Sequence, residues 1–400
     1  MKKIRWGIRI ELLLLVAMGC ACLVREMHVS RQTENVSLQE SVQEGNDENG
    51  EAIEVSADGN YIKWVDFNIT SEAMGKAYEL DVASYKDEVY VDWIELLAYV
   101  GTRHGGKFDK NCVSELQKTA EKLQSGETTM DELTKDMEYY DYYKEAYGAV
   151  LGGMVGEFSL EVPKDESGTK EWKDYYGLKA FSPIAKGFEY SHYDDFGSSR
   201  SYGYARPHLG HDMMGQIGTP IIAIESGYVE ALGWNQYGGW RIGIRSFDGK
   251  RYYYYAHLRQ NFPYNKSLEE GSIVTAGDVI GYMGHTGYST TENVNNIEVV
   301  HLHWGMQLIF DESQKDSNNE IWIDCYELTK FLYRNRSETQ KNEETKEWFR
   351  IYNMKDPAVE SVKEITKLEN TSLSDFKLHT KECRNAGILP MNVCVATGVE

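Results

Sequence analysis

Five of the ten histidines fall in three short groups, and these groups are the residues best suited to chemistry. The groups read PHLGHD at 207–212, YAHL at 255–258 and HLHW at 301–304. A lone histidine usually makes a hydrogen bond on the surface or in the core. Imidazole nitrogens together with a carboxylate are common ligands of zinc, however, and three such groups within one segment indicate a metal site.

Strand geometry predicts how two of these groups could meet. Residues two apart on a strand point to the same face, so His301 and His303 should emerge side by side. In an extended segment His208 and Asp212 would also share a face, with Gly210 leaving room between them. His208, Asp212 and His303 would then offer two nitrogens and one oxygen. Three protein ligands with an open fourth position are typical of catalytic zinc, which polarises carbonyls and acidifies water, and a nearby histidine can serve as the base.

The elements around these groups are predicted to be strands. Short β-prone runs bounded by Gly, Asn or Asp occupy 221–224, 228–232, 240–245, 251–255 and 301–309. The run WRIGIR at 240–245 alternates apolar residues with polar or small ones, as a half-buried strand does. Several such strands at close spacing predict an antiparallel β-sheet domain over residues 177–312.

The segment before the strands, residues 60–162, is predicted to be a small and mainly helical accessory domain. Helical spacing of apolar residues appears at 89–100, 113–124 and 130–158. The turn GETT at 126–129 should lead into a helix, with Thr128 or Thr129 as its cap. Residues 313–400 are expected to form a helical and irregular C-terminal extension. The fold class is therefore predicted to be α+β.

The N-terminus has the pattern of an export signal. Four basic residues within the first nine precede an uncharged apolar run at 12–24, which predicts a signal peptide or signal anchor at 1–27. Positive charge at this end places it in the cytoplasm and the rest of the chain outside the membrane. Residues 28–59 are rich in Glu, Gln, Asn and Ser and are expected to be an acidic flexible linker.

Charge and cysteine usage exclude other classes of protein. The 400 residues carry a formal net charge of −21, which argues against a nucleic-acid partner because phosphate binding needs a basic surface. None of the six cysteines forms a C-x-x-C pair, so a cysteine zinc site is disfavoured. The only membrane contact expected is the one made by the N-terminal segment.

The histidine motifs together resemble those of the lysostaphin-type, or LytM-like, zinc metallopeptidases, a family of peptidoglycan endopeptidases. The resemblance depends on H-x-G-x-D at 208–212, Y-x-H-L at 255–258 and H-L-H followed by an aromatic residue at 301–304, in that order. Flanking runs of the same kind are GTPIIA at 218–223, GSIVTAGDVIG at 271–281 and GHTGYST at 284–290.

This resemblance implies roles for particular residues. His208, Asp212 and His303 are implied to bind Zn²⁺. His257 and His301 are implied to be catalytic and to handle the proton of the attacking water and the oxyanion. The family's fold is an antiparallel β-sheet with a groove, and its usual substrate is a stem peptide or cross-bridge of peptidoglycan, outside the cytoplasmic membrane.

The chain departs from the family's usual pattern after the GHTGYST loop. Residues 291–300, TENVNNIEVV, intervene before the third histidine motif and should reshape the rim of the substrate cleft. His211 and His285 occupy positions that vary in the family, and both are interpreted as non-ligands.

Two other functions compete with an endopeptidase. A non-hydrolytic LytM-like scaffold could use the same fold to bind an envelope or sporulation partner. Alternatively, the chain could be a wall- or sugar-binding module in which the histidines are incidental. Non-hydrolytic members of the family usually lack a zinc ligand, whereas this chain keeps all five key residues, and this favours the endopeptidase.

Overall fold

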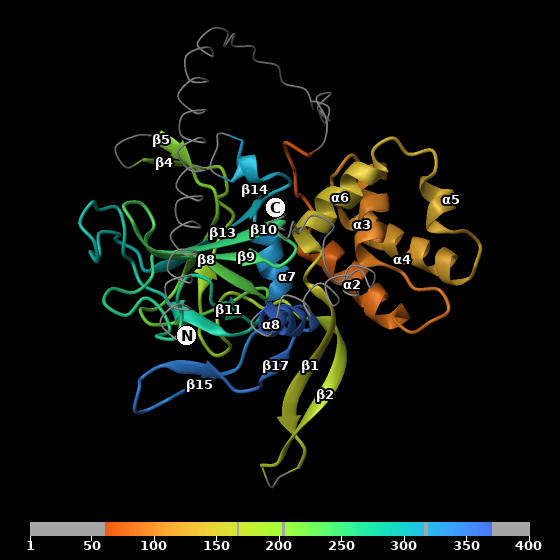
Figure 1. Ribbon diagram of the computed structural model, residues 1–400. Coiled ribbons are helices and arrows are strands. Elements are labelled where there is room, and N and C mark those ends of the chain that lie inside the picture. Colours follow the sequence, from red (N-terminus) through yellow and green to blue (C-terminus); the bar gives the residue numbers. More distant parts are fainter. Residues whose placement is uncertain (1–60, 166–167, 202–204, 316–318, 370–400) are drawn as a thin grey trace, which may run out of the picture. The chain divides into compact units, whose positions relative to one another are not determined.

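The computed structural model (Figure 1) describes residues 61–165, 168–201, 205–315 and 319–369. These residues belong to one unit, Glu54–Glu400. The predicted signal segment at 1–27, the linker at 28–59 and the last part of the C-terminal extension, 370–400, lie outside the described residues. Within the described part of the chain, no helix is both long and apolar enough to span a bilayer.

Eight strands form the main sheet, and each pairing in it is antiparallel. Seven of them follow the order β11-β8-β9-β10-β13-β6-β3, and β14 pairs with β13. Their bounds are β3 Ser191–His192, β6 His211–Met214, β8 Gly227–Asn235, β9 Gly239–Ser246, β10 Arg251–Ala256, β11 Ile273–Val274, β13 His301–Leu308 and β14 Ile321–Trp322. The predicted antiparallel sheet is confirmed.

Alternating burial gives the sheet a core face. On β13, the side chains of Leu302, Trp304 and Met306 are fully buried, while His301 and His303 alternate with them along the strand and therefore point to the opposite face. On β10, Tyr253 and Tyr255 are fully buried in the same way. The period of two in the sequence thus sorts core residues from site residues.

Three two-stranded sheets accompany the main sheet. β7 (Pro220–Ile222) pairs with β12 (Val279–Tyr282), and β4 (Ser199–Ser201) forms a hairpin with β5 (Ala205–Pro207), which leads directly into His208. β15 (Thr339–Lys341) pairs with β16 (Trp348–Arg350). The run predicted as a strand at 221–224 therefore corresponds to β7.

Five helices in the described part of the chain precede the sheet: α2 Ser71–Ser84, α3 Trp93–Arg103, α4 Lys110–Gln124, α5 Met130–Thr134 and α6 Tyr140–Leu151. The side chain of Thr129 accepts a hydrogen bond from the Glu132 backbone N–H and caps α5. Of the two predicted cap residues, Thr128 and Thr129, the structure uses Thr129. The helical prediction is wrong for 155–158, because α6 ends before Gly152 and the chain then enters a strand.

That strand, β1 (Val155–Pro163), pairs with β2 (Lys170–Leu178) over nine residue pairs and also with β17 (Met354–Lys355). The resulting hairpin extends from the rest of the described chain (Figure 1). Residues 155–158 form their backbone hydrogen bonds with β2 instead of within a helix. The two glycines at 152–153 have low helix propensity and end α6 just before this strand.

Helices that follow the sheet pack against the helices that precede it. The C-terminal extension contains η1 (Glu312–Gln314), α7 (Tyr326–Leu332) and α8 (Pro357–Glu369). On α7, a carboxylate oxygen of Glu327 accepts from the Ser71 backbone N–H at 2.6 Å, at the start of α2. The rings of Phe331 and Trp93 stack with centroids 5.8 Å apart. The helical layer is thus assembled from two distant stretches of the chain.

A buried ion pair joins this layer to the sheet. Arg251 opens β10, is 1% exposed and donates to both carboxylate oxygens of Glu225, at 2.7 and 3.0 Å. Its Nη1 donates to the carbonyl of Ala149 in α6 at 2.7 Å. Tyr253 also donates to Glu225, at 2.6 Å. One guanidinium therefore satisfies groups on both sides of the contact between helices and sheet.

Candidate metal centre

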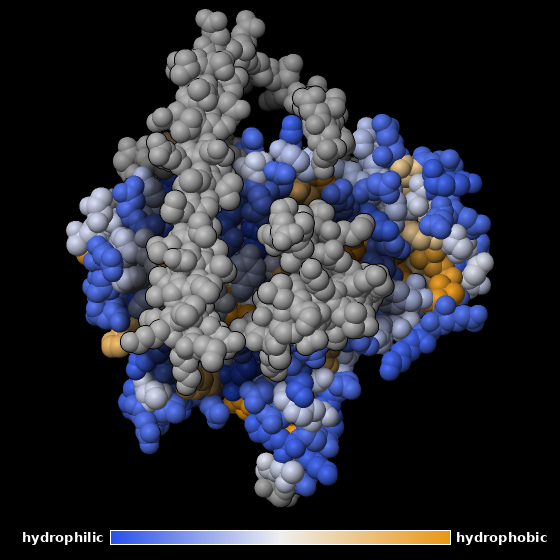
Figure 2. Space-filling model, viewed as in Figure 1, coloured by the Kyte–Doolittle hydropathy of each residue, from blue (hydrophilic) through white to orange (hydrophobic). Residues whose placement is uncertain are grey.

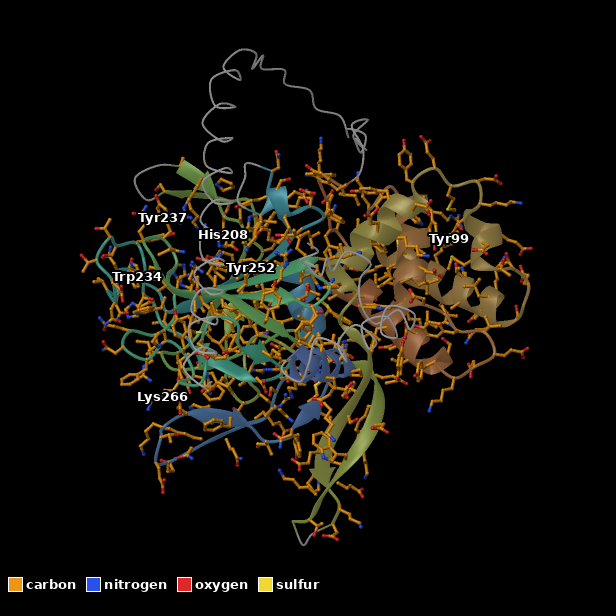
Figure 3. All side chains as sticks on the ribbon, viewed as in Figure 1. Tyr99, His208, Trp234, Tyr237, Tyr252 and Lys266 are labelled. Carbon is orange, nitrogen blue, oxygen red and sulfur yellow. The ribbon has the colours of Figure 1, made fainter. Side chains whose placement is uncertain are left out.

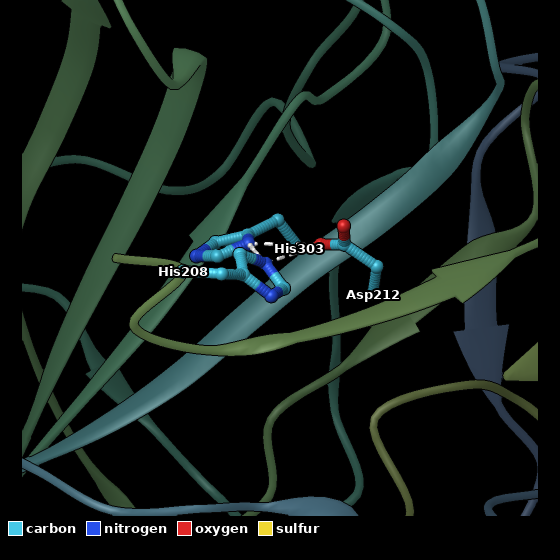
Figure 4. A group of neighbouring side chains, drawn as sticks. All are labelled: His208, Asp212 and His303. Carbon is cyan, nitrogen blue, oxygen red and sulfur yellow. Dashed lines mark hydrogen bonds and ion pairs between the residues drawn. The ribbon is translucent and has the colours of Figure 1, made fainter. Parts of the chain in front are cut away.

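Three side chains converge with ligand atoms at nearly equal spacing (Figure 4). Nε2 of His208 lies 3.1 Å from Oδ1 of Asp212 and 3.0 Å from Nδ1 of His303. The third side of the triangle, from Nδ1 of His303 to Oδ1 of Asp212, is 2.9 Å. Among the described residues this is the one group of three or more potential ligands close enough to share a metal ion.

Strand register accounts for the convergence. β6 and β13 are neighbours in the main sheet, and their pairing sets Asp212 directly opposite His303. His208 comes from the turn before β6, where its backbone N–H donates to the Ser198 carbonyl at 2.9 Å. A Cβ atom at Gly210 would lie 2.5 Å from the His303 ring, so the absence of a side chain there admits that imidazole.

The outer hydrogen bonds of His208 favour one tautomer. Its Nδ1 lies 3.3 Å from the backbone carbonyl oxygen of Asp195, which can only accept. Nδ1 therefore carries the proton, and the lone pair of Nε2 faces Asp212 and His303. A metal-binding histidine is typically oriented in this way by an acceptor behind it.

Electrostatics in the cluster favour an ionised carboxylate. Burial alone would raise the pKa of Asp212, but the adjacent imidazoles of His208 and His303 outweigh it and hold this pKa far below its usual range. Burial would lower the pKa of His208, yet the contact with Asp212 prevails and raises it. Burial is the largest influence on His303 and lowers its pKa. The carboxylate is thus charged and available to a cation.

Two further histidines face the same centre. Nδ1 of His257 donates to the Thr286 carbonyl at 2.9 Å, and Nδ1 of His301 donates to the Val299 carbonyl at 2.8 Å. Both Nε2 atoms are therefore the unprotonated nitrogens of the neutral rings. Nε2 of His301 is 3.7 Å from Oδ1 of Asp212, and the His257 and His301 ring centroids are 4.7 Å apart.

The loop that holds His257 is tightly constrained. His257 has a left-handed backbone with φ of +60°, and its N–H donates to the Gly238 carbonyl at 2.7 Å. Burial, followed by the neighbouring His301 and His303, holds the pKa of His257 well below its ordinary value. A non-glycine residue with positive φ at such a position is a strained conformation that the surrounding contacts impose.

The two histidines interpreted as non-ligands lie outside the cluster. Nε2 of His211 lies 2.8 Å from Nδ1 of His192, and the His211 ring packs against Tyr326. Nδ1 of His285 donates to the Ile297 carbonyl at 2.6 Å. The structure therefore brings together the five residues predicted as ligands and catalytic groups and places His211 and His285 elsewhere.

A groove of about 720 Å³ runs past the cluster. Figure 3 labels three of its residues, His208, Tyr237 and Tyr252, in the sheet region, whereas Tyr99 lies among the helices. Besides the histidines, the lining includes Arg200, Arg206, Tyr237, Tyr252, Tyr254, Tyr288, Lys315 and Trp322. The visible face of the molecule is otherwise largely hydrophilic (Figure 2).

Several of these lining residues are absent from the prediction. Tyr252 and Tyr254 alternate with the buried Tyr253 and Tyr255, so the period of two in RYYYYA could have assigned them to the groove. Arg206 precedes His208 by two residues, and the same rule could have found it. Trp322 reaches the groove through the pairing of β14 with β13, for which the sequence offers no local signal.

The intervening residues 291–300 lie at the rim of the groove. The Asn293 side chain accepts from the Trp240 indole N–H at 2.9 Å and from the Asn261 backbone N–H at 2.8 Å. Ile297, from the same stretch, lines the groove. The insertion thus contributes a wall of the groove and leaves the cluster residues on their strands.

Comparison with known proteins finds a family match within this region. Residues 206–318 match Peptidase family M23. The L-Ala–D-Glu endopeptidase of Bacillus subtilis is 38% identical over 146 residues, which cover 36% of this chain and 41% of that protein. Lysostaphin of Staphylococcus simulans is 42% identical over 89 residues, or 22% of this chain and 17% of that protein. The chain thus spans less than half the length of these curated relatives.

Solved structures show similar segments. A LytM from Ruminococcus gnavus is 23% identical with a TM-score of 0.42, over 68% of this chain and 89% of that one. The catalytic domain of lysostaphin from Staphylococcus simulans is 32% identical with a TM-score of 0.28, over 35% of this chain and 92% of that one.

Proposed function

Because residues 206–318 are a Peptidase family M23 domain, we propose that this chain is a zinc-dependent endopeptidase acting on peptidoglycan peptides. The bonds it cuts lie in stem peptides or cross-bridges. The observation that carries the proposal is the convergence of His208, Asp212 and His303 within 3.1 Å of one another, on the wall of a groove. A binding module or scaffold would not need this donor set.

The donor set fits zinc. Two imidazole nitrogens and one carboxylate oxygen form the three-ligand pattern that leaves a position open to substrate, whereas structural sites take four protein ligands. His208 is held in the required tautomer by the Asp195 carbonyl, and Asp212 is ionised. When bound, zinc supplies a Lewis acid that polarises the scissile carbonyl and makes water more acidic.

His257 and His301 carry the proton chemistry in this proposal. Each ring is fixed by a hydrogen bond from Nδ1 to a backbone carbonyl, so its Nε2 is free to accept a proton. One of these rings takes the proton of the attacking water. That proton is delivered to the leaving amine as the C–N bond breaks, while the other ring, protonated at Nε2 from solvent, donates a hydrogen bond to the developing oxyanion. Their fixed orientation avoids reorganisation during the reaction.

The place of action follows from the family and from the N-terminal sequence. Peptidase family M23 peptidoglycan hydrolases act outside the cytoplasm. We propose that residues 1–27 anchor the chain to the cell membrane, or direct its secretion if they are cleaved. Residues 28–59 would then give the enzyme reach toward the wall, and the helical region at 60–162 would serve as an accessory to the catalytic sheet.

Substitution of the histidines tests this assignment. The variants His208→Ala and His303→Ala should lose both zinc and cleavage, while His257→Ala and His301→Ala should keep about one zinc per chain and lose most turnover, typically by 10²-fold or more. Zinc is measured by elemental analysis, and cleavage by the release of new amino groups from peptidoglycan.

His211→Ala is the matched control, since it removes an imidazole next to Asp212 that lies outside the cluster. It should retain about one equivalent of zinc. Equal turnover in wild type and His303→Ala would contradict the mechanism. Loss of zinc from a folded His211→Ala variant would contradict the ligand assignment.

A further inference from the structure

Three cations among the described residues line the groove, and they differ in their ion pairs. Arg200 pairs with Asp195 and Asp212, and Lys315 pairs with Glu230 at 2.6 Å. Arg206 makes no ion pair with any residue that the structure describes. Its positive charge is therefore available to something that enters the groove.

Arg206 is nevertheless held in place. Its guanidinium lies over the rings of Tyr237 and Tyr288, at 5.1 and 5.5 Å from their centroids. Its Nη2 donates to the Tyr288 hydroxyl at 3.0 Å, which is the guanidinium's one hydrogen bond to the described part of the chain. Nε is buried without a hydrogen-bond partner there. Contacts with aromatic rings fix the plane of the guanidinium while leaving charge unneutralised.

The two tyrosines lie on two loops that are joined by backbone hydrogen bonds. The Tyr288 backbone N–H donates to the Tyr237 carbonyl at 3.3 Å, and the next residue, Ser289, donates to the Gln236 carbonyl at 2.9 Å. At Gly287 a Cβ atom would lie 2.5 Å from the Tyr237 carbonyl oxygen, so the close approach of the loops depends on that glycine. We call Arg206, Tyr237 and Tyr288 the arginine cradle.

The arginine cradle lies beside the reacting groups. The Tyr288 ring centroid is 6.0 Å from that of His257, which is 4.7 Å from that of His301. A residue of an extended peptide spans about 3.5 Å. A peptide with its scissile bond at the histidines therefore brings the neighbouring residue within reach of Arg206.

We propose that Arg206 determines specificity by binding a free carboxylate on the substrate residue next to the scissile bond. This rests on the proposed peptidase function and deepens it. A guanidinium is matched to a carboxylate in charge and in planar geometry, and it forms stronger hydrogen bonds with an ionised partner than with a neutral amide. The substrate class is accordingly an acidic stem peptide, since a bridge made only of glycine offers no side-chain carboxylate.

A pair of synthetic peptides tests the proposal. Both contain γ-linked D-Glu beside the bond to be cut, and they differ only in whether its α-carboxylate is free or is a primary amide. The zinc-loaded full chain should favour the carboxylate peptide by about tenfold or more in kcat/KM. Arg206→Gln should lose that preference without losing zinc, and Arg206→Lys should keep part of it because it retains charge but not the planar fork.

Lys266→Gln is the matched control. It removes the same charge from an exposed residue outside the groove, labelled in Figure 3, and should leave the preference unchanged. Binding is measured separately by calorimetry in a His301→Ala background, where the carboxylate peptide should bind about tenfold more tightly than the amide only if Arg206 is present.

The two measurements separate the possible failures. The proposal would be overturned if Arg206→Gln still preferred the carboxylate peptide as the wild type does. It would also be overturned if kcat/KM fell equally for both peptides, since Arg206 would then only support the structure of the loops. If the zinc-loaded wild type cleaves neither peptide, the peptidase function on this substrate fails. The binding measurement still decides whether Arg206 discriminates between carboxylate and amide.

Discussion

The buried pair of Arg251 and Glu225 gives a sharp prediction about stability. Arg251→Ala removes a guanidinium that is 1% exposed and that makes two hydrogen bonds to Glu225 and one to the Ala149 carbonyl. Glu225 itself is 8% exposed and would keep only the hydrogen bond from Tyr253. An uncompensated buried charge costs about 3–5 kcal/mol, so the free energy of unfolding should fall by that amount.

A double-mutant cycle separates the pair from the other losses. Removing both charges, in Arg251→Met with Glu225→Leu, leaves no buried charge behind and should cost clearly less than the sum of the two single changes. The free energy of unfolding is measured by urea denaturation of the full chain, followed by circular dichroism. A loss of under about 1 kcal/mol in Arg251→Ala, or additive losses in the cycle, would refute this account of how helices and sheet are joined.

Two further perturbations test other parts of the structure. Gly210→Ala places a Cβ atom 2.5 Å from the His303 ring and should lower the zinc content measured by elemental analysis, whereas Gly148→Ala, whose Cβ would meet nothing closer than 3.9 Å, should leave it unchanged. Burial would raise the pKa of Asp248, but the charge of Arg251, together with hydrogen bonds from Ser246 and the Lys250 backbone, outweighs burial and lowers it. This carboxylate therefore stabilises the fold above its unfolded pKa of about 3.9 and stops doing so as pH falls through its lower folded value. In Arg251→Met the free energy of unfolding should therefore fall less steeply as the pH is lowered. Acid denaturation followed by fluorescence measures this, and the same pH dependence in wild type and variant would contradict the prediction.

Much of the main sheet could be predicted because the pattern that specifies it is local. The alternation in WRIGIR and HLHW sets which side chains enter the core, and the observed strands β9 and β13 follow it. The spacing of His301 and His303 predicted that these two side chains share a face of the sheet, whereas His208 lies in the turn before β6 and not on an extended strand. The convergence of Asp212 and His303 required only that β6 and β13 be neighbours, and the register provides this.

The parts that escaped prediction depend on contacts between distant residues. Helical spacing continues past Leu151, but β1 exists because β2 and β17 pair with it. The position of Trp322 in the groove likewise depends on β14 joining β13. Arg206 belongs to none of the sequence motifs. Its free positive charge is recognised only in the structure, where Arg200 and Lys315 form ion pairs and Arg206 forms none with the described residues. Periodicity reports which face a residue occupies, but not which distant segment covers that face.

The packing of α7 against α2 affects how this protein can be divided. Trp304, on the core face of the strand that carries His303, donates to the Thr329 hydroxyl of α7 at 3.2 Å, and the same helix receives Trp93 from α3. A fragment cut at the boundaries of the sheet would leave this indole facing solvent. Recombination of this sheet with a different module would therefore have to transfer the segments on both sides of it together.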